Sequence, residues 1–245
     1  MSETPAETKP SFRSEVNVDL VKHSAGDSDV LWAARVSTAG EQSLEELSKD
    51  PERSKGLINF LMRDRHGSPF EHNSMTFFIS APIFVFREFM RHRVGWSYNE
   101  ESGRYRELQP VFYVPDASRK LVQEGRPGKY VFVDGTQEQQ DLTERAMTES
   151  YRQAYEAYQE MLAAGVAREV ARAVLPVGLY SSMYATCNAR SLMHFLGLRT
   201  QHEAAKVPSF PQREIEMVGE KMEEQWARLM PLTHAAFNGN GRVAP

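Results

Sequence analysis

The sequence lacks features that several classes of protein require. Its 245 residues include one cysteine, Cys187, so an internal disulfide framework and a cysteine-rich zinc site are both excluded. No apolar run approaches the ~20 residues needed to cross a bilayer, and Met1–Pro10 lack the basic-then-apolar order of a secretion signal. We therefore expect a cytoplasmic protein with no membrane association.

A strong positive charge is also missing. The chain has 29 Lys and Arg against 33 Asp and Glu, which gives a formal net charge of −4. Nucleic-acid-binding domains usually carry a basic patch or stripe, and none is visible here. We therefore expect no nucleic-acid partner, and any anion site must be local.

Standard nucleotide and metal motifs are absent as well. No Gly-x-Gly-x-x-Gly follows an expected strand, and Gly125-Arg-Pro-Gly128-Lys129 lacks the length and the hydroxyl of a phosphate loop. The sequence has neither a Gly-x-Ser-x-Gly elbow nor a His-Glu-x-x-His zinc motif. Glu71 and His72 are adjacent, so on a strand they would point to opposite faces, and we expect no metal site.

Hydrophobic periodicity predicts a mixture of helices and strands. Strands are predicted where apolar residues alternate or where aromatic and β-branched residues gather: 15–23, 74–80, 111–114 and 180–186. Helices are predicted at 29–34, capped by Asp27 or Ser28, and at 50–65, 83–92, 143–163, 166–175, 190–204 and 212–230. An ordered polar loop is predicted at 94–106 and a surface excursion at 124–135.

These elements predict a helix-rich α+β fold. We expect one large catalytic domain over residues 15–235, with a small, mostly antiparallel sheet and a helical lobe. Residues 1–14 and 236–245 are predicted to be tails, the first of them mobile.

The densest concentration of functional side chains lies between Arg87 and Arg106. Arg87 and Arg91 would share a helical face, which favours a negative partner from Glu88, Glu100 or Glu101, or a bound phosphate. Arg91 and Arg93 would differ by about 200° around a helix, so either the helix ends between them or they serve different ligands or chains. Ser97, Asn99, Ser102 and Gly103 beside Arg104 suit a phosphate or a ribose. The alternative is a solvated loop whose arginines pair with Glu100, Glu101 and Glu107.

Two further clusters contain arginine. In the first, Arg168 and Arg172 share a face with Glu169 available to Arg172, and an ordinary amphipathic surface helix is the main alternative. In the second, Arg190 and His194 lie one turn apart and Arg199 follows an apolar stripe. Because an arginine is costly to bury without a partner, Arg199 is the stronger functional candidate there.

These segments together resemble the flavin-dependent thymidylate synthases, over residues 15 to 230. The resemblance rests on Arg91-His92-Arg93, Ser97-Tyr98-Asn99 and Ser102-Gly103-Arg104-Tyr105, supported by Ala33–Ser37, His66–His72, Arg172–Pro176 and Asn188–Met193. Eight residues, 94–101, separate Arg93 from Ser102 where the family usually has seven, and the extra one falls near Gly95-Trp96. Glu88 replaces a common Gln, and His194 a common Asn. Residues 207–211 lengthen the loop after Arg199, around His202.

The resemblance implies the fold of that family and a homotetramer with active sites at subunit interfaces. It further implies FAD as cofactor, NADPH as reductant, methylenetetrahydrofolate as carbon donor and dUMP as substrate. The positions that match flavin contacts are Ser68, Arg91, His92, Arg93, Glu100, Asn188, Ala189, Arg190 and His194. The positions that match dUMP contacts are Glu88, Phe89, Met90, Arg91, Glu100, Glu101, Ser102, Gly103, Arg104, Arg172 and Arg199.

Within this set, Arg199 is the expected catalytic residue, because a fixed guanidinium at the base edge would stabilise developing negative charge. Glu88 is expected to accept a ribose hydroxyl or to pair with Arg91, since a carboxylate beside a phosphate would be repelled. Ser102 and Cys187 have no sequence-adjacent base and are not expected to be nucleophiles.

Two other functions stay open from the sequence. The same chemistry on UMP would differ from the dUMP reaction by one substrate hydroxyl. A non-catalytic nucleotide- or RNA-binding protein could instead stack bases on Trp96, Tyr98 and Tyr105, although the net negative charge counts against it.

Overall fold

The computed structural model describes residues 9–40, 50–126 and 129–245. The chain divides into two compact units, which we name after one helix in each and describe separately. Of the described residues, the α5 unit takes those within 9–16, 80–87 and 100–182, and the α7 unit takes the rest. Within the described ranges, no helix is both long and apolar enough to cross a membrane.

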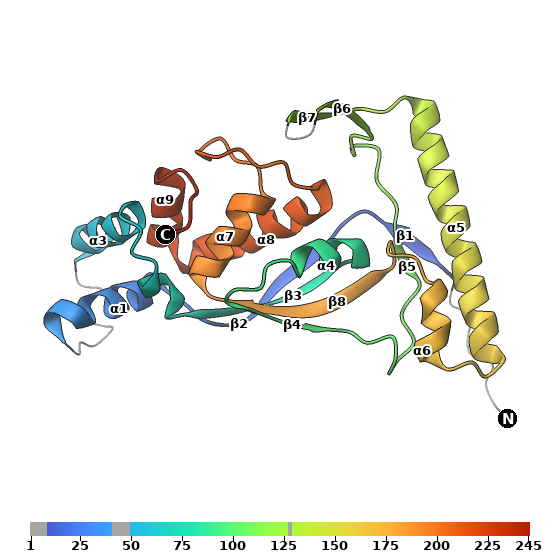
Figure 1. Cartoon of the computed structure of the whole chain (residues 1–245), viewed down its shortest axis with the longest axis horizontal. Helices are drawn as coiled ribbons and strands as arrows, with labels where there is room; N and C mark the ends of the chain where they lie inside the picture. Colours follow the sequence, from blue (N-terminus) through green and yellow to red (C-terminus); the bar gives the residue numbers. More distant parts are fainter. Residues whose placement is uncertain (1–8, 41–49, 127–128) are drawn as a thin grey trace. The chain divides into compact units, whose positions relative to one another are not determined.

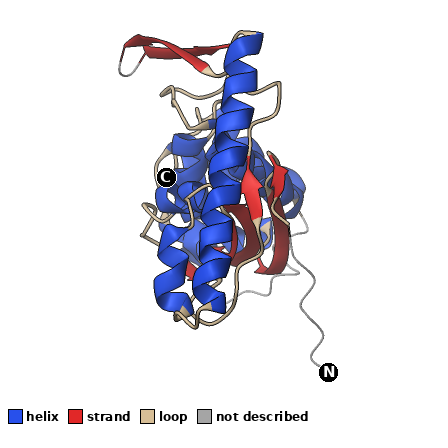
Figure 2. Ribbon diagram, turned by 90° about the vertical axis from the view of Figure 1, so that its right-hand side faces the viewer, coloured by secondary structure: helices blue, strands red, loops and turns tan. Residues whose placement is uncertain are grey.

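Helix α5 (Gln137–Ala163) is the main element of the α5 unit. It begins earlier than predicted because Thr136 and Gln139 form a capping box, in which each side chain accepts the other's backbone N–H. Beside this end of α5, both views place the antiparallel pair β6 (Val122–Arg126) and β7 (Lys129–Val133) (Figures 1 and 2). The surface excursion predicted at 124–135 is confirmed where it is described, since most residues of β6 and β7 are exposed. It forms a hairpin, because the β-branched and aromatic residues of β7 pair with β6; residues 127–128 lie outside the described chain.

The core of the α5 unit forms where α5 meets a short parallel pair of strands. Strand β1 (Ser11–Arg13) pairs with β5 (Val111–Tyr113), the strand predicted at 111–114. Tyr151, Tyr155 and Tyr158 share one face of α5 and pack with Phe112, which is fully buried. The position of β1 also means that the predicted tail at 1–14 is ordered at residues 11–13, while residues 1–8 lie outside the described chain.

The helix predicted at 166–175 is interrupted. Helix α6 (Arg168–Ala171) passes directly into a 3₁₀ turn, η2 (Arg172–Val174), and the chain turns extended at Leu175, with φ −70° and ψ 131°. Pro176 accounts for this end, because the residue before a proline is disfavoured in the helical region.

The α7 unit contains most of a four-stranded sheet in the order β2-β3-β8-β4. Its strands are β2 (Asn17–Ser24), β3 (Ser74–Pro82), β8 (Tyr180–Cys187) and β4 (Trp96–Glu100). Buried residues alternate along β3, where Met75, Phe77 and Ile79 are all fully inaccessible, so one face of the sheet is covered. The first three strands lie where the sequence predicts them, whereas β4 replaces the predicted loop.

Helices supply the rest of the α7 unit, and their presence confirms the helix-rich α+β class. They are α1 (Asp27–Ala39), α3 (Pro51–Arg63), η1 (Ser68–Glu71), the end of α4 (Ile83–Phe89), α7 (Ala189–Arg199), α8 (Arg213–Leu229) and α9 (Pro231–Gly239). Helix α8 is tied to strand β2 by Gln225, which accepts the Leu20 N–H at 2.6 Å and donates to the Val18 carbonyl at 3.0 Å. Trp226, Met222 and Phe195 are fully buried in this core.

Helix α7 ends at Arg199 instead of the predicted residue 204. Thr200 leaves the helix with φ −131° and ψ 145°, and its hydroxyl donates to the Leu196 carbonyl at 2.7 Å. The Leu196 carbonyl also accepts the Thr200 N–H at 3.0 Å, so the backbone and the side chain of Thr200 together close the last turn of α7.

The cap predicted for α1 was wrong, because Asp27 has a long-range partner. The N-cap of α1 is Gly26, whose N–H is bound by the Asp29 carboxylate at 2.7 Å. Asp27 instead accepts three hydrogen bonds at the start of α9: the backbone N–H groups of Leu232 and Thr233, both at 2.9 Å, and the Thr233 hydroxyl at 2.6 Å. A single carboxylate thus caps a helix that the sequence did not predict.

Replacing Asp27 with Ala is expected to lower the free energy of unfolding by about 1–2 kcal/mol, because α9 loses its N-terminal cap. Urea denaturation followed by circular dichroism measures this change. Asp64→Ala serves as the control, because Asp64 pairs with Arg63 at the surface and its loss should change little. Equal stability of the Asp27→Ala and wild-type proteins would contradict the capping role.

Residues 236–245 also differ from the predicted tail. Ala236 and Phe237 lie in α9, and Arg242 and Ala244 are only 3% and 8% exposed. The Arg242 side chain forms an ion pair with Glu223. On either side of Arg242, the Gly241 carbonyl accepts the Lys206 N–H and the Ala244 carbonyl accepts from the Arg65 guanidinium. The short polar stretch after α9 gave no apolar period from which this packing could be predicted.

Candidate active site

Helix α4 ends at Phe89, and residues 90–95 form a turn that carries the Arg-His-Arg segment. Backbone N–H groups of Arg91 and His92 donate to the carbonyls of Glu88 and Phe89 at 3.2 and 3.0 Å. Arg91 and Arg93 therefore both lie beyond the helix, which removes the conflict expected from helical spacing. Both are exposed, and neither guanidinium has an ion-pair or hydrogen-bond partner among the residues that the structure describes.

Packed aromatic rings fix the position of the turn at residues 90–95. Phe89 is fully buried and makes edge contacts with Trp96 and Tyr98 at centroid distances of 5.3 and 5.8 Å. The Trp96 and Tyr98 rings stack at 5.9 Å, and the Tyr98 hydroxyl donates to the His92 carbonyl at 2.6 Å. Since these two rings lie against each other and against Phe89, they serve as packing groups in this structure.

Arg199, His92 and Glu88 form one polar cluster. Arg199 Nε donates to His92 Nε2 at 3.0 Å, and Arg199 Nη1 pairs with the Glu88 carboxylate. The Arg199 and Glu88 side chains are 22% and 26% exposed, so water screens their attraction only in part. Glu88 therefore pairs with Arg199, which corrects the expectation that it binds Arg91.

The surroundings of this cluster also determine the protonation state of His92. Desolvation, helped by the positive charge of Arg199 and by His194, lowers the pKa of His92 to about 4. His92 is thus neutral at neutral pH, and Nε2 must be its unprotonated nitrogen because it accepts from Arg199. The proton lies on Nδ1, and the guanidinium is held by one neutral and one negative acceptor.

The N-terminus of α7 lies against the same turn. The Asn188 side chain caps α7 by accepting the Ser191 N–H at 2.9 Å, and the Ala189 N–H donates to the Asn73 side chain at 2.8 Å. Ser191 Oγ reaches across and donates to the Val94 carbonyl at 3.0 Å. These contacts join the Arg91–Arg93 turn to the start of α7.

Gly95 makes this approach possible. Its φ of +71° is unfavourable for other residues, and a Cβ at this position would lie 2.1 Å from Ser191 Oγ. The extra residue of this segment is thus accommodated by a left-handed glycine that packs directly on α7.

Replacing Gly95 with Ala is expected to displace the Arg91–Arg93 turn and to abolish uptake of the flavin that the resemblance implies, because the methyl group and Ser191 cannot occupy the same space. Flavin absorbance of the purified protein measures this. Gly165→Ala is the matched control: Gly165 has φ +83°, but nothing lies within 4 Å of its added Cβ. That variant should lose only about 1–2 kcal/mol of stability through strain and keep the flavin. Normal uptake by Gly95→Ala would contradict the role of this contact.

Arg190 links α7 to the segment around Ser68. Its Nε donates to the Pro245 carbonyl at 2.6 Å, and its Nη1 pairs with Glu71 at 2.7 Å. The guanidinium lies on Gly67, where a Cβ would be 2.6 Å from Cζ. Ser68 is the exposed first residue of η1, so it lies next to this contact. His194, one turn on from Arg190, has a lowered pKa because of desolvation and the charges of Arg190 and Arg65.

The α5 unit contains the second group of predicted residues. Gly103 is buried, and a Cβ there would lie 3.3 Å from Arg172 Cδ. Desolvation raises the pKa of Glu100, with Glu101 acting in the same direction and Arg172 in the opposite one. Glu100, Gly103 and Arg172 are therefore neighbours within this unit.

The remaining ion pairs of the α5 unit differ in part from expectation. Arg104 pairs with Glu169 at 2.7 Å, so Glu169 does not serve Arg172 as predicted. Arg106 pairs with Glu101 at 3.3 Å, as the solvated-loop alternative suggested. Ser102 Oγ accepts the Arg104 N–H at 3.3 Å. The Arg104 and Arg106 side chains are half exposed or more, so both pairs are open to exchange for a ligand.

The predicted positions thus gather within each unit. The α7 unit contains Ser68, Glu88, Phe89, Met90, Arg91, His92, Arg93, Asn188, Ala189, Arg190, His194 and Arg199, and the α5 unit contains Glu100, Glu101, Ser102, Gly103, Arg104 and Arg172. Sequence reasoning did not identify Asn73, Ser191 or Gly67, which hold the predicted residues in place. Gly67 and Ser191 stood within the motifs His66–His72 and Asn188–Met193, which could have pointed to them, whereas Asn73 stood in no motif.

The donor set of the α7 unit fits an anionic dinucleotide. The two exposed guanidinium groups of the turn suit a pyrophosphate, and the neutral His92 between them in the sequence leaves these two groups as the cations of the turn. Cys187, by contrast, is buried and its pKa is raised by desolvation, which disfavours a thiolate nucleophile.

Comparison with known proteins agrees with these features. The chain matches the family described as thymidylate synthase complementing protein over residues 19–232. It is 88% identical to a flavin-dependent thymidylate synthase of Streptomyces avermitilis over the whole of both chains, and 60% identical to one of Tropheryma whipplei over 96% of this chain and 98% of the other. Two crystal structures of the UMP/dUMP methylase PolB of Streptomyces cacaoi, one with 5-Br UMP and one with 5-Br dUMP, are 56% identical. The structure with 5-Br UMP has a TM-score of 0.88 and the one with 5-Br dUMP a TM-score of 0.90. Both matches cover 96% of this chain, and they cover 99% and 100% of the PolB chains, respectively.

Proposed function

Because the chain belongs to the thymidylate synthase complementing protein family, the flavin-dependent thymidylate synthases, we propose that it methylates dUMP to dTMP with FAD, NADPH and methylenetetrahydrofolate. The family makes it a methyltransferase, so the non-catalytic RNA-binding alternative is wrong. The packing of Trp96 and Tyr98 against Phe89 also argues against their use as base-stacking platforms. The observation that carries the proposal is the Arg199–His92–Glu88 cluster beside the exposed Arg91–Arg93 turn.

Residues of the α7 unit would bind FAD. Arg91 and Arg93 would donate to its phosphates, and the capped start of α7 at Asn188 and Ala189 would lie against it with Ser68, Arg190 and His194. Glu100, in the α5 unit, belongs to the same proposed set. The raised pKa of Glu100 suits a carboxyl group that accepts or donates a hydrogen bond to a neutral ligand atom.

Residues of both units would bind dUMP. Arg172 and the Ser102–Arg104 segment offer cationic and short polar donors for the nucleotide phosphate, and Glu101 can accept a ribose hydroxyl. Phe89 would contribute from the end of α4, Met90 and Arg91 from the turn after it, and Arg199 from the end of α7. A homotetramer with active sites at subunit interfaces belongs to the same proposal.

Arg199 would activate the pyrimidine. When bound, FAD would supply the reducing equivalents, taken from NADPH, that convert the methylene carbon donated by methylenetetrahydrofolate into a methyl group. The Arg199 guanidinium, held by His92 and Glu88, would stabilise negative charge that develops on the base. Because these acceptors fix the guanidinium before substrate arrives, little reorganisation is required when the charge forms.

UMP is a second candidate substrate. The observation that favours it is the 56% identity to a UMP/dUMP methylase whose structure was solved with a UMP analogue bound. The two substrates differ by one hydroxyl. A binding pocket discriminates only modestly against a ligand with an added hydroxyl, unless that hydroxyl clashes with the protein or leaves a polar group unpaired.

Product analysis tests the proposal. The purified enzyme is incubated with FAD, NADPH and methylenetetrahydrofolate, and dUMP and UMP are supplied in parallel reactions. Chromatography with mass detection should find dTMP, and omission of FAD or of methylenetetrahydrofolate should remove it. Methylation of UMP alone would replace dUMP as substrate, and no methylated nucleotide from either would overturn the proposed function.

A further inference from the structure

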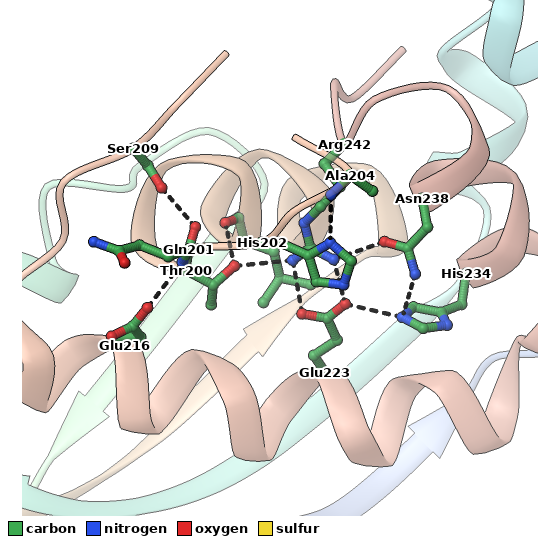
Figure 3. A network of polar contacts seen from close by, with 11 residues as sticks. Thr200, Gln201, His202, Ala204, Ser209, Glu216, Glu223, His234, Asn238 and Arg242 are labelled. Carbon is green, nitrogen blue, oxygen red and sulfur yellow. Dashed lines mark hydrogen bonds and ion pairs between the residues drawn. The ribbon is translucent and has the colours of Figure 1, made fainter. Parts of the chain in front are cut away.

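A buried arginine, Arg242, contacts the C-terminal end of α7. Its guanidinium binds both oxygens of Glu223, at 2.6 and 2.7 Å, and it is 3% exposed (Figure 3). It also donates to Thr200 Oγ1 at 2.9 Å and to Asn238 Oδ1 at 2.7 Å. A planar fork that makes four hydrogen bonds fixes the relative positions of all its partners, and lysine could not reproduce it.

The ion pair is stable in its ionised form. Desolvation would raise the pKa of Glu223, but hydrogen bonds from Arg242 and His234 outweigh it and lower the pKa to about 2. The His234 ring contacts Glu223 at 2.9 Å and Asn238 at 3.2 Å. A buried charge pair of this kind is a poor source of stability compared with apolar packing, so its geometry requires another explanation.

Thr200 connects this network to the candidate active site. It follows Arg199 directly, is 3% exposed, and its hydroxyl both accepts from Arg242 and donates to the Leu196 carbonyl in the last turn of α7. The Thr200 carbonyl accepts from Ser209 Oγ at 2.6 Å, and the next N–H, of Gln201, is bound by Glu216 at 2.8 Å (Figure 3). The backbone on which Arg199 stands is thus fixed from several sides, and Arg242 supplies the buried contact.

The neighbours of Arg242 hold the other end of α7. A Cβ at Gly197 would lie 3.0 Å from the Arg242 carbonyl, so the segment passes tightly over the helix. The Ala244 carbonyl accepts from Arg65 and the Pro245 carbonyl from Arg190, both at 2.6 Å. Residues 242–245 therefore run along α7 from Thr200 to Arg190.

We propose that Arg242 is a positioning residue that sets the orientation of Arg199 through Thr200, and so places the guanidinium that acts on the pyrimidine. The catalytic role of Arg199 in this inference rests on the proposed function, but the effect of Arg242 on the position of Arg199 can be tested without substrate. Because Arg199 Nε contacts His92 Nε2, the titration of His92 reports the position of Arg199 without any substrate. If Arg199 moves away, His92 loses a nearby positive charge and its pKa rises from about 4 toward its ordinary value of 6.5.

The experiment uses Arg242→Met, Thr200→Val and the double variant in the full chain. Thr200→Ser is the matched control, because it keeps the hydroxyl that Thr200→Val removes. Asp50→Ala controls for lost stability alone, since Asp50 caps α3 through the Arg53 N–H at 3.0 Å and lies outside the network. Histidine ring resonances are titrated by NMR, and kcat and KM for dUMP are measured in parallel.

Arg242→Met and Thr200→Val should each raise the pKa of His92 and lower kcat by about tenfold or more, with a smaller change in KM. The double variant should be no worse than the more affected single variant, as expected when one residue acts through the other. Thr200→Ser and Asp50→Ala should titrate like wild type.

An unchanged His92 titration in folded Arg242→Met, additive effects on kcat, or equal effects in Asp50→Ala would overturn the proposal. If Arg242→Met does not fold, the comparison of Thr200→Val with Thr200→Ser decides in the same way. Shifted His92 titrations in an enzyme that methylates no nucleotide would support the positioning role and refute the proposed function.

Discussion

Replacing Arg199 with Ala is expected to lower kcat for dUMP methylation by about 10²–10³-fold while FAD stays bound. The loss follows from the place of the guanidinium at the end of α7, where His92 and Glu88 hold it ready to stabilise negative charge on the base. Arg199 donates to one residue of the proposed flavin set, His92, but it forms no hydrogen bond or ion pair with Arg91 or Arg93, whose guanidinium groups are proposed to bind the flavin phosphates. Steady-state kinetics and flavin absorbance measure the two properties separately.

Two further variants make this test specific. Arg199→Lys keeps the charge but cannot donate to His92 Nε2 and Glu88 with the same planar geometry, so it should recover only a small part of kcat. Arg228→Ala should behave as wild type, because Arg228 pairs with Glu224 on an exposed face of α8. Full activity in Arg199→Ala would remove its assigned role, and loss of FAD in that variant would make it a binding residue instead.

Replacing Arg91 with Ala is expected to weaken both FAD and dUMP binding by about 10–100-fold, the range for a lost charge-assisted hydrogen bond. Arg93→Ala should weaken FAD binding to a similar extent but leave dUMP affinity nearly unchanged, because, of these two arginines, Arg91 alone belongs to both proposed sets. The exposed, unpaired state of both guanidinium groups among the described residues makes them available for this role.

Separate titrations of flavin absorbance and of dUMP by calorimetry distinguish the two variants. Arg63→Ala is the control, since Arg63 forms an exposed pair with Asp64 on α3 and should leave both affinities unchanged. The assignment fails if Arg91→Ala and Arg93→Ala have the same effect on dUMP, or if neither changes flavin affinity.

Local sequence signals predicted the elements whose determinants are themselves local. Asp50-Pro51 marked the start of α3, and the Asp50 side chain does accept the Arg53 N–H. Aromatic and β-branched residues placed β3, and the residue before Pro176 marked the end of a helix. In each case the deciding interaction lies within a few residues of the signal.

The missed features depend on partners far away in the sequence. Asp is a residue type that often caps the helix next to it, but more than 200 residues of chain separate Asp27 from the α9 groups that it binds. Strand β4 alternates aromatic with polar residues, but this run is short and the polar residues around it favoured a loop. The strand is fixed by Phe89 and by its place in the sheet.

The same limit applies to the candidate site. The motifs identified Arg91, His92 and Arg199, but the ion pair of Glu88 with Arg199 joins residues from different helices and could not be read from spacing. Arg242 lay in a stretch predicted to be a tail, because a buried arginine leaves no apolar period in the sequence. Residues proposed to bind a ligand thus carried a sequence signal, whereas Glu88 and Arg242 are placed by partners that spacing did not reveal.

In the proposed reaction, oxidation of a bound flavin is coupled to methylation of a nucleotide at the Arg199 cluster. A single-turnover reaction tests it most directly: protein loaded with reduced FAD is mixed without oxygen with dUMP and methylenetetrahydrofolate, and flavin absorbance and nucleotide products are followed together. We predict one dTMP for each flavin reoxidised by the wild type, and a flavin that stays reduced in Arg199→Ala. A flavin that reoxidises without forming dTMP, or that behaves identically in both proteins, would contradict the account.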